Sequence, residues 1–191
     1  MADFRRETER LVLRDWRDGD WEAQWRVTNT PTVMRWLGGV LDDEGIAKQI
    51  ARVETCQANN GFCFWVVERK DDGGHLSGEM LGMCGLKRAD APGSSVTGTM
   101  EIGWRMREEA WGHGYAKEAA MAAMELGFTR FGADQIVALT VQGNEPSWGL
   151  MLRLGMTRRQ DLDYEDTRYS AELNPTIVYA IAKDEWEQQA Q

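Results

Sequence analysis

The feature that most constrains the fold is a strand, a glycine turn, a long helix and a second strand that follow one another between residues 97 and 141. Residues 97–106 alternate in character, and Gly112 and Gly114 then precede a helical pattern that starts at Ala116. One face of this helix carries mostly small residues, which allow close approach to a sheet. A buried strand pattern follows at residues 136–141. Two strands joined through a helix in this way lie parallel, and such crossovers are nearly always right-handed.

The first part of the chain predicts antiparallel strands with helices between them. Strand patterns occupy residues 8–14, 62–68 and 80–86, and residues 71–74 (Asp-Asp-Gly-Gly) have the composition of a hairpin turn. One helix opens at Asp20 and carries Trp21 and Trp25 on one face. A second helix is capped by Asp42 and runs to about residue 59, with an apolar stripe of Ile46, Ile50 and Val53.

The last part of the chain predicts one short helix and two more strands. The helix begins at Asn144 and ends at Gly155, and the strands lie near Met156 and at residues 176–181. The whole pattern predicts an α/β (α+β) fold. Its central sheet is mixed and has about seven strands, with an antiparallel first half, a parallel pair in the second half, and helices on both faces.

Length and composition favour a single domain. The chain has 191 residues, of which 42% are hydrophobic, which suffices for one well-buried core and is short for two domains. No apolar run approaches the roughly 20 residues that a membrane span needs. The first residues are charged rather than typical of a signal peptide. We therefore expect a cytoplasmic protein that does not enter a membrane.

Metal and nucleic-acid chemistry are not expected. Three cysteines and two histidines form none of the clusters that usually bind zinc or iron, so we predict no metal and no disulfide. The net charge of -9 would repel a phosphate backbone. A cationic substrate fits this charge better, although an acidic balance is also ordinary for a soluble protein.

The loop at residues 111–116, called the glycine loop below, favours a phosphorylated ligand. Gly112 and Gly114 precede the positive end of a helix, so several backbone N–H groups can converge on a pyrophosphate without a metal. The alternative is a tight strand-to-helix turn in which the glycines only supply positive φ angles. The loop ends Tyr115-Ala116-Lys117. It therefore lacks the Gly-Lys-Ser/Thr of a Walker loop, and Lys117 stands where the dinucleotide fingerprint wants Gly or Ala.

Four motifs resemble the GCN5-related N-acetyltransferase (GNAT) superfamily in their order and spacing. They are Glu101-Ile102-Gly103-Trp104, Trp111-Gly112-His113-Gly114-Tyr115-Ala116-Lys117-Glu118-Ala119, Asn144 with Ser147, and Leu154-Gly155-Met156. More narrowly, the chain is similar to the branch that includes the bacterial (RimJ/RimL-like) acetyltransferases of ribosomal-protein N-termini. The resemblance extends over about residues 8–186, so residues 1–191 are expected to form one GNAT domain with that core.

The resemblance implies acetyl-CoA as cosubstrate. In the family, the strand ending at Met106 splays from its parallel neighbour, and the pantetheine arm lies in the V-shaped opening. Backbone groups near Trp104 and Met106 would then pair with pantetheine, and one N–H there would polarise the thioester oxygen. The glycine loop would hold the pyrophosphate through the backbone of Trp111, Gly112, His113, Gly114, Tyr115 and Ala116. Asn144 is a favoured helix N-cap that can also contact the cofactor.

Two residues are candidates for catalysis. Strand alternation places Glu101, Gly103 and Arg105 on one face, and a carboxylate there can accept a proton from the substrate ammonium through a water. The alternative is a surface carboxylate paired with Arg105 or another neighbour. Many family members use a tyrosine as the acid, but Met151 stands at that position. The similar branch often uses a serine one turn earlier, where Ser147 either stabilises the leaving sulfur or only begins the helix.

The sequence thus predicts direct transfer of an acetyl group from acetyl-CoA to a primary amine. A protein N-terminus, a small amine and an amine-bearing antibiotic all remain open as acceptors. The alternative is a catalytically silent acyl-CoA-binding or sensor module. The sequence does not fix the oligomeric state, and a homodimer is compatible with it.

Overall fold

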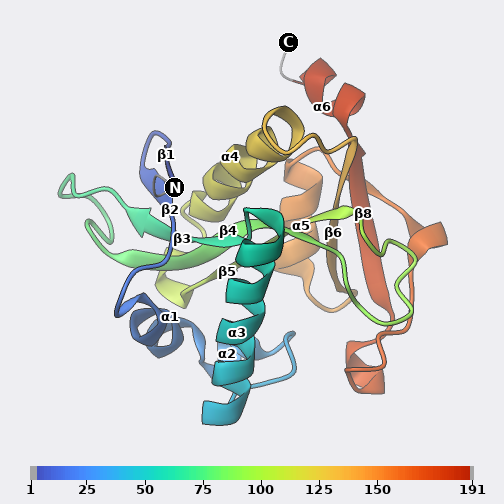
Figure 1. Cartoon of the computed structure of the whole chain (residues 1–191), viewed down its shortest axis with the longest axis horizontal. Helices are drawn as coiled ribbons and strands as arrows, with labels where there is room; N and C mark the ends of the chain where they lie inside the picture. The colour runs from blue at the N-terminus through green and yellow to red at the C-terminus, as the bar shows by residue number, and fades with distance from the viewer. Residues whose placement is uncertain (1–3, 190–191) are drawn as a thin grey trace. The chain divides into compact units, whose positions relative to one another are not determined.

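The computed structural model describes residues 4–189, and its strands form one mixed sheet in the order β1-β2-β3-β4-β5-β6-β8-β7 (Figure 1). The predicted α/β class is therefore confirmed. The prediction of about seven strands was one short, because Arg5–Glu7 (β1) pairs antiparallel with Leu11–Arg14 (β2). The sequence pattern predicts one strand over residues 8–14. Instead, Thr8 N–H donates to the Leu11 carbonyl at 3.0 Å, and this turn folds β1 back onto β2.

The chain forms two compact units, and each is described here by itself. Unit 1 contains the residues up to Gly85 together with Trp104–Ala122. Unit 2 contains Leu86–Gly103 and the residues from Ala123 onward. The expectation of a single domain over residues 1–191 stays a prediction.

The helices of unit 1 begin and end at clear local signals. The first is Asp20–Thr28 (α1). The four-residue helix Pro31–Met34 (α2) was not predicted, although the Thr30 side chain caps it and Pro31 begins it. The long helix Asp43–Asn60 (α3) is capped by Asp42, whose side chain accepts from Gly45 N–H at 2.8 Å, and it ends at Gly61 with φ 73°. Of its predicted stripe, only Val53 is buried, so Ile46 and Ile50 stay partly exposed.

The strands of unit 1 pair in sequence order. Phe64–Arg69 (β3) lies antiparallel to β2 and to Met80–Arg88 (β4). The predicted turn residues 71–74 lie in the connection between the antiparallel strands β3 and β4, but this connection is longer than a tight hairpin turn, because β3 ends at Arg69 and β4 begins only at Met80. Residues 70–79 form a longer loop, in which Ser77 Oγ accepts from the N–H groups of Asp72 and Gly73 at 2.9 Å. Sequence composition identified the turn residues but not the length of the loop.

Unit 2 contains the predicted parallel pair. Met100–Met106 (β5) pairs parallel with Gln135–Val141 (β6), with Met100 opposite Ile136 and Ile102 opposite Ala138. Thr176–Ala182 (β8) lies antiparallel between β6 and Thr157–Arg158 (β7). The unit also contains Glu145–Arg153 (α5) and Lys183–Gln189 (α6).

The crossover helix Tyr115–Thr129 (α4) has the close packing that its small residues predict. A Cβ added at Gly127 would lie 2.8 Å from the Ile136 side chain, so the helix backbone approaches β6 closely at that point. Ala123 and Met124 are fully buried. The small residues on this face of α4 therefore allow the helix to pack closely against β6 in unit 2.

Candidate functional site

The glycine loop precedes α4 and exposes a row of backbone donors. Gly112 has φ 78° and Gly114 has φ 79°, a region that favours glycine. Residues 111–114 form a turn, and within residues 4–189 no short backbone hydrogen bond is donated by the N–H groups of residues 112–117. A Cβ at Gly112 would meet no atom within 4 Å, so the space beside the loop is open. Unpaired N–H groups at the positive end of a 15-residue helix fit an anionic phosphate.

An ion pair holds this loop against the turn between β1 and β2. Arg10 Nε donates to Glu118 on α4 at 2.7 Å, and Arg10 Nη1 donates to the His113 carbonyl at 3.0 Å. Burial raises the pKa of the Glu118 carboxyl, but hydrogen bonds from Thr8 and Arg10 outweigh it, and the pKa is lowered overall. No local pattern predicts this ion pair, because Arg10 and Glu118 are 108 residues apart.

Three rings stack beside the loop. The His113 ring lies 3.9 Å from the His75 ring, centroid to centroid, and 5.7 Å from the Tyr115 ring. The buried Tyr115 hydroxyl donates to the His75 carbonyl at 3.2 Å and accepts from Arg69 Nε at 3.3 Å. The His113 ring is therefore packed in this stack, and the expected contact of its backbone with a pyrophosphate stays a prediction.

The loop is also tied to the end of β5. Trp111 Nε1 donates to the Met106 carbonyl at 3.0 Å, although 46% of Trp111 is exposed. Met106 is buried and Trp104 is half-buried, so the expected alternation along β5 holds at Met100, Ile102 and Met106. The Met106 carbonyl, one of the β5 backbone groups expected to pair with pantetheine, thus already accepts a hydrogen bond from Trp111.

A glycine on β4 lets the backbone approach this end of β5 very closely. A Cβ at Gly82, where φ is 143°, would stand 2.1 Å from the Arg105 carbonyl oxygen. Arg107 N–H donates to the neighbouring Leu81 carbonyl at 2.8 Å. Only glycine fits this approach, so Gly82 sets the position of the strand that leads into the glycine loop.

In unit 2, Glu101 belongs to a charged cluster. Its carboxylate lies 3.0 Å from Lys87 Nζ, and both side chains are only 13% exposed. Lys87 also contacts Asp90 at 2.7 Å. The alternative interpretation of Glu101, as a carboxylate paired with Arg105 or another neighbour, agrees with the ion pair to Lys87 but stays a prediction. Burial raises the pKa of the Tyr164 hydroxyl, and the nearby negative charge of Glu101 raises it further.

Asn144 and Ser147 lie where α5 begins, also in unit 2. Asn144 stands at the N-cap position, but its side chain makes no capping bond and instead donates to Thr140 Oγ1 at 3.0 Å. The favoured N-cap role is therefore not realised by its side chain. Ser147 is half-buried in the first turn of α5, and Met151 is fully buried. A sulfur-bearing Met151 side chain offers no proton, as the sequence indicated.

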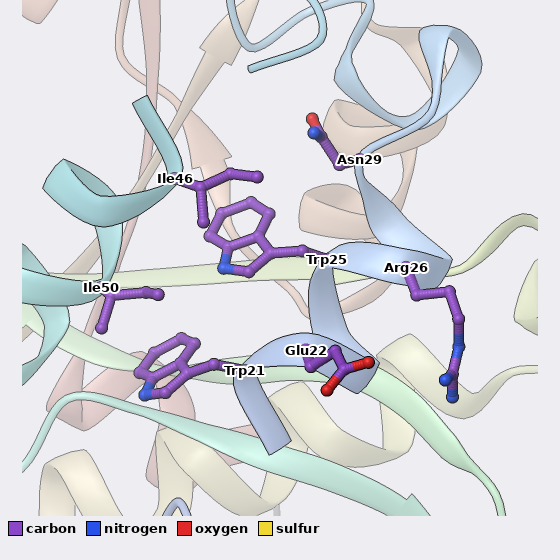
Figure 2. A pocket seen from close by; sticks show the side chains of 7 residues that line it. All are labelled: Trp21, Glu22, Trp25, Arg26, Asn29, Ile46 and Ile50. Atoms are coloured by element: carbon purple, nitrogen blue, oxygen red, sulfur yellow. The ribbon is translucent and has the colours of Figure 1, made fainter. Parts of the chain in front are cut away.

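A pocket of about 550 Å³ opens between α1 and α3 within unit 1, and we call it the α1–α3 pocket. Figure 2 shows the rings of Trp21 and Trp25 extending from α1 toward Ile46 and Ile50 of α3. The remaining lining residues are Glu22, Arg26 and Asn29. The sequence placed both tryptophans on one face of α1 but gave no indication of what that face meets.

Known protein families include one that matches most of this chain. The model of the acetyltransferase (GNAT) domain matches residues 10–157. The uncharacterized N-acetyltransferase YnaD of Bacillus subtilis is 30% identical over 179 residues, which cover 94% of this chain and 97% of that protein. The FsC-acetyl coenzyme A-N(2)-transacetylase of Aspergillus fumigatus is 26% identical over 172 residues, covering 86% and 70% of the two chains.

Solved structures share the fold. The acetyltransferase of Agrobacterium tumefaciens superposes with a TM-score of 0.75 at 21% identity, over 95% of each chain. The ribosomal-protein-S5-alanine acetyltransferase of Vibrio fischeri gives 0.70 at 16% identity, over 96% of this chain and 99% of that one. At these identities the likeness concerns the fold, and the family rests on the sequence matches.

Proposed function

Because the chain belongs to the acetyltransferase (GNAT) family and is therefore an acyltransferase, we propose that it transfers acetyl from acetyl-CoA directly to a primary amine. The glycine loop carries this proposal. Its donors without backbone acceptors, its two positive-φ glycines and the helix behind it fit the pyrophosphate of the cosubstrate. The name of the Aspergillus relative, an acetyl coenzyme A transacetylase, supports the same cosubstrate.

In this proposal the chain's own groups bind, orient and move protons. Acetyl-CoA supplies the activated acetyl group. The N–H groups of the glycine loop hold its pyrophosphate, and the backbone near Trp104 and Met106 pairs with its pantetheine arm. Glu101 accepts a proton from the substrate ammonium through a water, so that the amine nitrogen can bond to the acetyl carbon while the carbon–sulfur bond breaks. Ser147 donates a hydrogen bond to the departing sulfur, and Asn144 contacts the cofactor.

A covalent acetyl-cysteine route is not part of the proposal. Burial raises the pKa of the Cys84 thiol to about 12, so this residue is a poor nucleophile at neutral pH. Cys63 is buried as well, and Cys56 contacts the Phe62 carbonyl through its sulfur. Direct transfer within a ternary complex is the simpler scheme for these residues.

Calorimetric titration with acetyl-CoA tests the cosubstrate site, with ATP and desulfo-CoA alongside. We expect Gly112→Asp to weaken acetyl-CoA binding about tenfold or more, because a carboxylate near the phosphates repels them by about 1–3 kcal/mol. Gly132→Asp is the matched control, since Gly132 also has positive φ and no atom within 4 Å of an added Cβ. Equal affinities for the two variants would contradict the assignment of the glycine loop.

The role of Glu101 needs a different control, because Lys87 contacts two carboxylates. If Glu101 is the base, Glu101→Gln should lower kcat about 100-fold or more, the usual contribution of general base catalysis. Asp90→Asn removes the other carboxylate on Lys87 and should leave kcat within about threefold. Similar losses in both variants would reduce Glu101 to a structural ion-pair partner. Acetyl-CoA binding without any turnover by the unchanged protein would support the silent acyl-CoA-binding module instead.

The setting of this reaction is also a proposal. Among residues 4–189, no helix is long and apolar enough to cross a membrane, and no group of three or more His, Cys, Asp or Glu could hold a metal ion. We place the transfer in the cytoplasm, with an amine as the partner molecule and without nucleic acid.

A further inference from the structure

The α1–α3 pocket is an open depression with mainly apolar walls. Its volume of about 550 Å³ lies within the range of ligand pockets, and two indole rings and two isoleucines form its apolar walls. The outer wall is firmly held, because Trp16 stacks on Trp21 with ring centroids 3.5 Å apart and donates its own Nε1 to the Phe64 carbonyl. An apolar group of a ligand would gain about 25 cal/mol for each Å² buried there.

One polar group inside this pocket lacks a partner. Trp25 is 8% exposed, and none of the described residues accepts a hydrogen bond from its Nε1. Buried donors are nearly always paired, and an unpaired one costs about 1–3 kcal/mol. The nearby amide of Asn29 is already engaged, because it exchanges two hydrogen bonds of 2.9 Å with the backbone of Leu41. Because Nε1 is buried within the described residues, an oxygen of a bound ligand would satisfy it once the Trp25 ring shifts toward the pocket.

The same tryptophan connects the pocket to the strand where the cosubstrate arm is proposed to bind. The Arg105 guanidinium lies 5.2 Å from the Trp25 ring centroid. Arg105 stands between Trp104 and Met106, whose backbone is assigned to pantetheine in the proposed function. Trp25 therefore lines the α1–α3 pocket and also contacts a side chain of the strand that the proposed function assigns to pantetheine.

The charge of the pocket does not suit a polyamine. Its lining contains one carboxylate, on Glu22, and one guanidinium, on Arg26, so the two charges cancel. Both side chains are exposed, and Figure 2 shows them extending away from the tryptophan rings. A ligand with several ammonium groups would need several carboxylates, whereas one with a single ammonium and an apolar body suits these walls.

We propose that the α1–α3 pocket binds the amine acceptor, which is a primary amine carrying a large apolar group and an uncharged carbonyl oxygen that accepts a hydrogen bond from Trp25 Nε1. This inference rests on the proposed function. Amino-acid amides and peptide N-termini with a large apolar first residue share this chemistry, so they belong to the same class.

Binding measurements on the whole protein test this class without relying on catalysis. The probes are phenylalaninamide, 2-phenylethylamine, which lacks the carbonyl, and spermidine, which lacks the apolar group. We expect phenylalaninamide to bind about tenfold more tightly than 2-phenylethylamine, and spermidine to bind weakest. Comparing phenylalaninamide with a peptide that begins with phenylalanine shows whether the pocket prefers small amino-acid amides or peptide N-termini. Tighter binding of spermidine than of phenylalaninamide would overturn the inference.

Two variants with matched controls locate the interaction. Trp25→Phe keeps an aromatic wall but removes the N–H, so it should abolish the preference for phenylalaninamide and leave 2-phenylethylamine affinity nearly unchanged. Trp36→Phe, outside the pocket lining, should preserve the preference. Ile50→Trp should fill the pocket and weaken both probes at least tenfold, whereas Ala51→Trp, at an exposed position on the same helix, should not.

Acetyl-CoA titration of each variant checks its fold and separates this inference from the proposed function. If phenylalaninamide binds with the expected dependence on Trp25 but is never acetylated, the ligand class stands and the transfer fails. If amines are acetylated at rates that respond to neither Trp25→Phe nor Ile50→Trp, the transfer stands and the pocket assignment is refuted.

Discussion

Gly82→Ala should destabilise the protein through a collision between two backbones. The new Cβ would stand 2.1 Å from the Arg105 carbonyl oxygen and 2.9 Å from the Met106 Cα, and both are main-chain atoms that cannot rotate away. Overpacking of this kind costs about 1–3 kcal/mol, and an alanine at positive φ adds about 1 kcal/mol. The sum is about 2–4 kcal/mol. For a chain of this size it corresponds to a fall in Tm of about 5–15 °C.

Gly61→Ala measures the cost of backbone strain at positive φ without the overpacking. Gly61 ends α3 with φ 73°, and a Cβ there would meet no atom within 4 Å. This control should cost only the backbone strain, about 1 kcal/mol, or a fall in Tm of about 2–4 °C. Thermal unfolding followed by circular dichroism measures both. The reasoning is refuted if Gly82→Ala is no less stable than Gly61→Ala. Acetyl-CoA affinity should also fall for Gly82→Ala, because the displaced strand leads into the glycine loop.

Two further changes probe the ion pairs that support the site. Glu118→Gln should lower Tm at pH 7. The folded state lowers the pKa of Glu118, so its carboxylate stabilises the fold fully only above the unfolded-state pKa. The difference in Tm between the variant and the unchanged protein should therefore shrink as the pH falls below about 4.3. Asp20→Asn should cost about 2–3 kcal/mol in urea unfolding, since it removes the bidentate partner of the buried Arg14 but leaves Glu68 beside it; a loss below about 0.5 kcal/mol would show that this pair contributes little.

Local signals made the crossover unit predictable. Two glycines before a helix with a small-residue face specify a turn with positive φ angles and close packing on a strand, and both properties depend on residues adjacent in sequence. The cap at Asp42 and the end of α3 at Gly61 follow the same kind of local rule. The missed helix α2 also had such a signal in Thr30 and Pro31, but four residues are too few to show a periodicity.

Partners across strands could not be predicted in the same way. Strand alternation placed Glu101 on a face of β5, yet the choice of Lys87 as its partner depends on the register between neighbouring strands. The tryptophans of α1 posed the same problem. Spacing at i and i+4 shows that Trp21 and Trp25 share a face, but only the position of α3 creates a pocket beside them. The candidate loop was therefore visible in the sequence, whereas the candidate acceptor pocket was not.

The two hydrogen bonds between Asn29 and the backbone of Leu41 close residues 30–40 into a tethered segment. This clamp joins the end of α1 to the start of α3, and Figure 1 shows α2 in the connection that it closes. Val33 and Met34 within this segment are buried, so the clamp ties a short piece of the core to both helices. For protein engineering, insertions should therefore be tolerated best at residues 38–40, between the buried pair and the clamp, where the tryptophan and isoleucine walls keep their spacing.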